Sequence, residues 1–186
     1  VVVVALGFAV PLSVAAVAST TAAPVVITDA PTLVTSTTAT LNGNANPNLS
    51  TATGYFRYAT TAPASCNDTF GTRAPTTGGT ALGAGSAPVA FSRAITGLVA
   101  GTTYFYCAIA SSAIGTGFGA VQSFTTPGAP TVTTSAATTI GSTTATLNGA
   151  ANPNLGDATG WFRYSTTSPG TCNDTFGTRA PATGGA

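Results

Sequence analysis

The side chains that could do chemistry in this chain are few, and three of them are cysteines. The 186 residues contain Cys66, Cys107 and Cys172, with five Arg and four Asp but no His, Glu, Lys or Met. Without a histidine, the common Cys/His zinc sites and any Ser-His or Cys-His nucleophile pair are excluded. The cysteines are therefore candidates for disulfides or for free thiols.

The charged residues are too sparse for several other kinds of site. Four scattered Asp and no Glu do not favour the paired carboxylates of a glycosidase. A net charge of +1 provides no basic face for nucleic acid. We therefore expect no catalytic residue, no metal ligand and no cofactor, and the chain is not expected to be an enzyme.

Two arginines recur at matching places between aromatic residues. Arg57 lies between Phe56 and Tyr58, and Arg163 lies in the same setting further along the chain. One interpretation is a cation resting on the ring of Phe105 or its equivalent, which is typically worth about 0.5–1 kcal/mol. The other is a surface contact with a ligand.

A second recurring motif follows two of the cysteines. Asn67-Asp68-Thr69 and Asn173-Asp174-Thr175 have the form of glycosylation acceptors, and they are also typical of a loop turn. Asp68 and Asp174 could also join calcium sites between repeats. Calcium sites usually gather several carboxylates, however, and this motif supplies one per copy.

The composition favours strands over helices. Threonine makes up about a fifth of the chain, and alanine, glycine, serine and valine supply much of the rest. The chain is 44% hydrophobic and 5% charged, with a mean hydropathy of +0.36, which argues against disorder. Threonine and valine favour strands, while glycine, proline and asparagine favour turns. We predict an all-β protein whose surface is made polar by hydroxyl groups.

The first 23 residues are predicted to be a targeting segment. Val1 to Ala18 is apolar apart from Ser13, and Ala16-Val17-Ala18 fits a signal-peptide cleavage pattern, with Ala23 as a second possible site. The rival interpretation is a retained membrane-spanning or pilin-like helix. We expect export, with a membrane contact only through this segment if it stays uncleaved.

An internal repeat divides the rest of the chain. Residues 24–80 return as residues 130–186 at a constant offset of 106, and 40 of the 57 positions are identical. A period this long corresponds to a whole small domain. The predicted domains are therefore 24–129, the first copy, and 130–186, a partial second copy. The second copy is expected not to fold alone and to belong to a longer tandem array.

Within the first copy, strand signals come at the spacing of a β-sandwich. We predict strands at 25–27, 39–41, 55–58, 89–95, 103–110 and 119–126. Residues 42–48 are predicted to be a turn, and residues 60–88 a long connection with one short edge strand. About seven strands in 100 residues favour an immunoglobulin-like antiparallel sandwich.

The segment Leu98-Val99-Ala100-Gly101-Thr102-Thr103-Tyr104 resembles the fibronectin type III signature Leu-x-Pro-Gly-Thr-x-Tyr. Tyr104-Phe105-Tyr106, Ser123 to Thr126 and Thr38 to Leu41 resemble further strands of that family, whose Thr-rich, secreted bacterial arrays are the most similar. Ala100 replaces the signature proline. The resemblance covers some 160 residues and implies that Tyr104 forms the tyrosine corner, its hydroxyl bonding to the backbone upstream. Phe56, Tyr58, Leu98, Tyr104 and Tyr106 should point inward.

The same resemblance brings two cysteines together. Cys66 follows the third strand, and Cys107 lies in the strand that this fold places beside it. A Cys66–Cys107 disulfide would close a loop of 42 residues and contribute about 3–4 kcal/mol. Free thiols are the alternative, and they would suit a cytosolic protein. Cys172 repeats Cys66, and its partner is expected beyond residue 186.

Three functions are compatible with these features. The first is a non-catalytic structural or adhesive module, secreted or at the cell surface, whose partner is an unidentified protein or polysaccharide. The second is an accessory spacer of a secreted enzyme. The third is a subunit of a filament or surface layer, in which the apolar N-terminal segment is retained.

Overall fold

Strands and turns, with no helix, make up the part of the chain that the computed structural model describes, residues 20–185. All strand pairs in this part are antiparallel. The prediction of an all-β chain with antiparallel sheets is therefore confirmed. The expected cleavage site near Ala18 lies outside the described residues.

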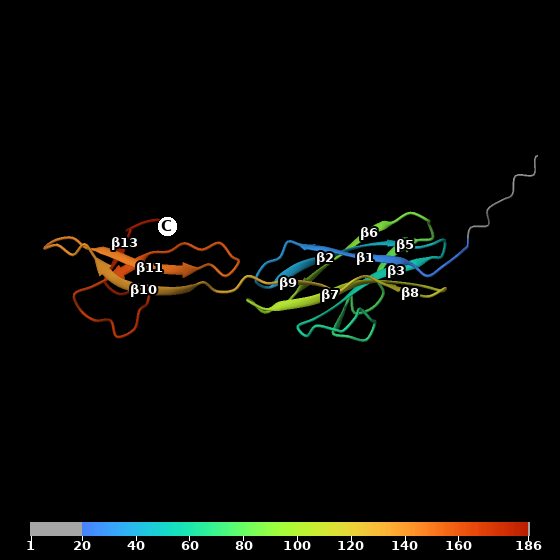
Figure 1. Ribbon diagram of the computed structural model, residues 1–186, viewed down its shortest axis with the longest axis horizontal. Coiled ribbons are helices and arrows are strands. Elements are labelled where there is room, and N and C mark those ends of the chain that lie inside the picture. Colours follow the sequence, from blue (N-terminus) through green and yellow to red (C-terminus); the bar gives the residue numbers. More distant parts are fainter. Residues whose placement is uncertain (1–19, 186) are drawn as a thin grey trace, which may run out of the picture.

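Two sheets form the first copy (Figure 1). The smaller sheet has the order β1 (Val25–Thr32), β2 (Thr38–Asn46), β6 (Val89–Thr96). The larger sheet has the order β4 (Thr72–Ala74), β3 (Ala52–Ala59), β7 (Thr103–Ser112), β8 (Thr116–Phe118). Two short strands complete it, with β5 (Thr80–Gly83) beside β3 and β9 (Gln122–Thr125) beside β7. The long 60–88 connection thus holds two short strands, not one.

The core lies between these sheets because alternate residues of each strand point inward. In β2, every second residue from Ala39 to Ala45 is buried. The rings of Phe56 and Phe91 face each other across the core with centroids 5.0 Å apart. Of the five residues expected inside, four are buried: Phe56, Leu98, Tyr104 and Tyr106. The fifth, Tyr58, is half-buried and packs against the core.

Glycines let the two sheets approach closely at two points. A Cβ on Gly54 would lie 2.9 Å from the Phe91 ring, and one on Gly43 would lie 2.7 Å from the Cβ of Ala108. Both distances are shorter than side chains tolerate, so these positions need a residue without a side chain. Both residues follow the alternation of their strands, and the space they leave is filled by the facing side chain.

The turn predicted at residues 42–48 is wrong, because β2 continues through Asn46. The small residues of this stretch fill the inward positions, and the asparagines point outward. Their side-chain amides bond neighbouring groups, from Asn42 Nδ2 to Ala30 O at 2.8 Å and from Asn46 Nδ2 to Ser86 O at 2.8 Å. Hydrogen bonds to an adjacent strand and to the loop before β6 therefore hold turn-forming residues in an extended conformation.

The last strand of the first copy is split in two, although one strand over 119–126 is predicted. The Thr28 hydroxyl crosses from the smaller sheet and accepts the Ala108 N–H at 3.0 Å. That N–H would otherwise bond to a continuous last strand. A Cβ on Gly119 would collide with the Thr28 hydroxyl, so a glycine is required beside it.

The second copy repeats the first half of this fold. Strand β10 (Thr131–Thr138) pairs with β11 (Thr146–Asn152), and β12 (Phe162–Tyr164) pairs with β13 (Thr178–Ala180). These registers equal those of β1 with β2 and of β3 with β4, shifted by the repeat offset. The two hairpins therefore adopt their local structure without the strands that cover them in the first copy.

Candidate functional site

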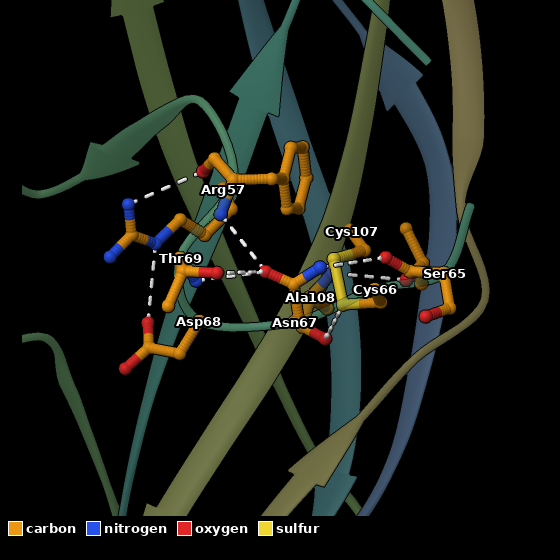
Figure 2. Close-up of a disulfide and its surroundings, with 10 residues drawn as sticks. Arg57, Ser65, Cys66, Asn67, Asp68, Thr69, Cys107 and Ala108 are labelled. Atoms are coloured by element: carbon orange, nitrogen blue, oxygen red, sulfur yellow. Dashed lines mark hydrogen bonds and ion pairs between the residues drawn. A yellow bond between two sulfur atoms is a disulfide. The ribbon is translucent and has the colours of Figure 1, made fainter. Parts of the chain in front are cut away.

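A disulfide joins the loop after β3 to the centre of β7. Cys66 and Cys107 are bonded, with their Cα atoms 6.0 Å apart and 41 positions apart in sequence. Figure 2 shows the bond on the face of the larger sheet that points away from the core. The predicted pairing is confirmed, and the alternative of free thiols is wrong for these two cysteines.

The loop that carries Cys66 is shaped by one asparagine. The Asn67 Oδ1 accepts hydrogen bonds from the Thr69 backbone N–H at 2.9 Å, the Thr69 hydroxyl at 2.7 Å and the Phe70 N–H at 3.0 Å. Asparagine followed by a short polar segment forms such turns readily. Of the interpretations of Asn-Asp-Thr, the loop turn is the one that these contacts favour.

Arg57 fastens the same loop to β3. Its Nε lies 3.2 Å from Asp68 Oδ1, and its Nη1 donates to the carbonyls of Phe70 at 3.3 Å and Gly71 at 3.2 Å. These contacts, the first of which is visible in Figure 2, leave 18% of the side chain exposed. The expected stacking of Arg57 on Phe105 is wrong, because the carboxylate and carbonyls of the loop occupy the guanidinium.

A second arginine, which the sequence analysis missed, makes the cation–π contact. The Arg73 guanidinium lies 3.8 Å from the centroid of the Tyr55 ring and donates to the carbonyls of Pro75 at 2.6 Å and Gly78 at 2.5 Å. The repeat carries the signal, because Arg179 lies 4.7 Å from the Trp161 ring centroid in the second copy. An aromatic residue is kept at the position under each arginine.

Beneath the loop lies a small apolar cluster separate from the main core. Tyr55, Cys107 and Ile109 are buried, and Cys66 and Phe70 pack against them. Burial is the main cause that raises the pKa of the Tyr55 phenol, followed by the charge of Asp68. The larger sheet is therefore covered on both faces, by the core on one side and by the disulfide-bonded loop on the other.

Tyr104 makes the contact that the resemblance implies. Its hydroxyl accepts the Val99 backbone N–H at 2.9 Å, five residues upstream. The chain beside it is fixed by Thr126, whose buried hydroxyl donates to the Val99 carbonyl at 2.7 Å and accepts the Thr102 N–H at 3.0 Å. The Leu98–Tyr104 segment is thus held by one tyrosine and one threonine.

Tyr106 links the two sheets. Its hydroxyl donates to the Asp29 carbonyl at 2.5 Å. Burial, followed by the nearby Asp29 charge, raises the pKa of Tyr106 to about 12. Burial likewise raises the pKa of Tyr58. Both phenols therefore stay neutral at physiological pH, and the hydroxyl of Tyr106 acts as a structural hydrogen-bond donor.

The second copy holds the same loop without a disulfide. Arg163 Nε lies 3.2 Å from Asp174 Oδ1, and the Trp161 indole donates to the same oxygen at 2.9 Å. The indole bond and then the Arg163 bond lower the pKa of Asp174. Cys172 is free and exposed.

The polar groups of this region have structural partners. Asp68 and Asp174 both face arginines. Within residues 20–185, no three His, Cys, Asp or Glu side chains gather where they could hold a metal ion. The chemistry of the described site is therefore structural: its disulfide cross-links the loop after β3 to the larger sheet.

No helix within residues 20–185 is long and apolar enough to cross a membrane.

Comparison with known proteins adds little. No protein-family profile matches the chain, and no curated protein matches it. Among solved structures, longer and shorter versions of the sensor domain of the anti-sigma factor RsgI4 in Pseudobacteroides cellulosolvens are similar at 14% identity. The longer version gives a TM-score of 0.38 over 57% of this chain and 91% of its own. The shorter gives 0.40 over 59% of this chain and 100% of its own. A likeness this weak carries no argument about function.

Proposed function

We propose that the chain is a non-catalytic spacer module of a secreted or cell-surface protein, built from fibronectin type III-like sandwiches. Two antiparallel sheets and the Tyr104 contact support the domain type. The disulfide is compatible with an extracellular location, because such bonds persist in oxidising compartments. The partner of the module is a protein or polysaccharide at the cell surface.

The direction of the chain through the first copy is the observation that carries this proposal. β1 begins at Val25, which pairs with Asn46 at one end of the smaller sheet. β9 ends at Thr125, which pairs with Thr103, where β7 begins. The chain therefore enters at one pole of the sandwich and leaves at the other. In Figure 1 the two copies follow one another along the long axis.

Because the chain enters and leaves each sandwich at opposite poles, each copy adds its full length to the array. β7 has 10 residues, which span about 33 Å at the usual rise of a strand. The surface suits such a role as well, since hydroxyl and amide groups make it polar with only 5% charged residues.

Small-angle X-ray scattering of the purified chain tests the spacer. We expect an elongated particle whose cross-section is that of one sandwich. The cross-section should not change between low and moderate salt, because few charges are present. A compact particle with the copies side by side would contradict the spacer role. Activity on a polysaccharide or peptide substrate would contradict the non-catalytic part of the proposal.

A further inference from the structure

The two copies are joined by a short linker, residues 127–130, and one asparagine of the second copy holds it. The Asn154 carbonyl accepts the Gly128 N–H at 2.9 Å, and the Asn154 side-chain amide donates to the Ala129 carbonyl. A single residue therefore bonds two consecutive linker residues, once through its backbone and once through its side chain.

The first copy holds the segment that enters it in the same way. The Asn48 side-chain amide donates to the Ala23 carbonyl at 2.8 Å, and the Asn48 carbonyl lies 3.4 Å from the Ala22 nitrogen. All three residues lie 106 positions before their counterparts at the linker. Both bonds go to backbone groups, so the contact survives the change from Ala22 to Gly128. It is a property of the repeat.

A strained loop presents this asparagine. Residues 152–155 have the sequence Asn-Pro-Asn-Leu, as do residues 46–49. The Asn152 side-chain oxygen accepts the Asn154 N–H at 2.9 Å, and Asn154 and Leu155 have left-handed backbones with φ of 50° and 68°. The first copy repeats both features. A leucine in this region is unfavourable and persists only where its surroundings fix it, which is typical of functional positions.

The first copy contacts the linker from its other side. The Gly101 N–H lies 3.2 Å from the Pro127 carbonyl, and a Cβ on Gly128 would lie 3.3 Å from the Gly101 Cα. The loop that the Tyr104 hydroxyl fixes therefore packs directly on the linker. Each of residues 127–129 is bonded to one copy or the other.

We propose that the second asparagine of the Asn-Pro-Asn-Leu loop, Asn48 or Asn154, is a latch that fixes each copy to the segment entering it. What the latch binds is an extended backbone of two residues, through one N–H and one carbonyl. Consecutive copies would thereby form a stiff joint with a fixed orientation. The proposal deepens the spacer role and rests on the copies following one another along the chain.

Without the latch, the linker would contain a hinge. Gly128 has more backbone freedom than any other residue type, and it lies between two prolines at positions 127 and 130. A hydrogen bond of ordinary net strength favours the closed form about two- to tenfold. The Asn154 latch supplies two such bonds at the position where the chain would otherwise bend.

Two substitutions separate the side-chain amide from the rest of the loop, with NMR hydrogen exchange of the full chain as the measurement. Asn154→Gly keeps the left-handed backbone and removes the amide, so the protection of the Gly128 N–H should fall about two- to tenfold. Asn154→Asp at pH 7 turns a carboxylate toward the Ala129 carbonyl, and protection should fall about tenfold or more. Once protonated, below about pH 4, the carboxyl can donate again and protection should return.

The first copy provides the matched control. Asn48→Gly should lower the protection of the Ala22 N–H and leave that of Gly128 unchanged, and Asn154→Gly should do the reverse. Residual dipolar couplings test the stiffness itself. The amides of β2 and β11 should fit one alignment tensor in the unchanged chain, and the couplings of β11 should shrink in Asn154→Asp at pH 7 but not in Asn48→Gly.

Three results would overturn the latch. The first is a Gly128 N–H that exchanges as fast as in an unstructured peptide. The second is an equal loss of protection throughout β10 and β11 in Asn154→Gly, which would show that the loop supports only its own hairpin. The third is separate alignment tensors for β2 and β11 in the unchanged chain. An elongated particle with any of these results would keep the spacer and refute the latch, and a compact particle with protected Gly128 would do the opposite.

Discussion

Breaking the Cys66–Cys107 bond should remove a large share of the stability of the first copy. The bond spans 41 positions, and the loop-entropy relation assigns such a loop about 3–4 kcal/mol. Domains of this size are typically stable by about 5–15 kcal/mol, so the loss is a major fraction. It corresponds to a fall in melting temperature of more than about 10 °C for a domain of about 100 residues.

Tyrosine absorbance is the appropriate probe for this measurement. Four of the five tyrosines lie in the first copy, whereas the only tryptophan lies in the second. Thermal unfolding of the full chain would be followed with and without reductant, and in a Cys66→Ala/Cys107→Ala variant. Cys172→Ser serves as the control and prevents exchange between thiols.

Both ways of opening the bond should destabilise the first copy, and the alanine variant should lose more because it also removes the buried Cys107 sulfur. Reduction leaves the buried Cys107 sulfur in place, so its effect isolates the cross-link from the packing of the side chain. The loop-entropy reasoning fails if reduction lowers the free energy of unfolding by less than about 1 kcal/mol. It also fails if Cys66 and Cys107 react freely with an alkylating agent in native, unreduced protein.

Three further perturbations test other contacts. Gly54→Ala should lower the free energy of unfolding by about 1–3 kcal/mol, because its Cβ would lie 2.9 Å from the facing phenylalanine ring. Gly85→Ala is the control: no atom lies nearer than 3.9 Å to its Cβ, so urea unfolding should be nearly unchanged. Since the pKa of Tyr106 is about 12 in the folded chain, against about 10 unfolded, stability should be fully present below pH 10 and fall by about 2 kcal/mol as the pH rises to 12. Tyr106→Phe should flatten part of that slope in unfolding titrations. Because the pKa of Asp174 is lowered, the NMR resonance of the Trp161 indole N–H should stay constant as the pH falls, until the pH is below about 3.9. In Asp174→Asn, this resonance should no longer change with pH.

The sequence predicted strands where apolar residues alternate, and it failed where side-chain hydrogen bonds override turn preference. Residues 42–46 read as a turn because asparagine and glycine favour turns in isolation. Their extended form depends on carbonyls of neighbouring elements, such as Ser86 O beside Asn46. The break between β8 and β9 likewise depends on Thr28, some 90 residues away in sequence.

The candidate site shows the same division. The Cys66–Cys107 pairing was predictable because it needs only which strands are neighbours. The partner of Arg57 was not, since Asp68 and two carbonyls reach it only after Asn67 has turned the loop. The contact of Arg73 with Tyr55 was encoded in the repeat, as a cation and an aromatic kept at the same two positions.

The placement of the disulfide also determines how far the first copy can stretch under tension. When the chain is pulled from its two ends, the residues between Cys66 and Cys107 bear no load, because the force passes through the sulfur atoms. The first copy has 106 residues, with a contour length of about 380 Å if fully extended, but with the bond intact it can release only about 240 Å. Strands β4, β5 and β6 lie inside the protected segment, so they stay close to β7 during extension. A stretched copy would therefore keep β4 and β5 of the larger sheet and β6 of the smaller sheet tethered to one cross-link, so that both sheets can re-form when the tension is released.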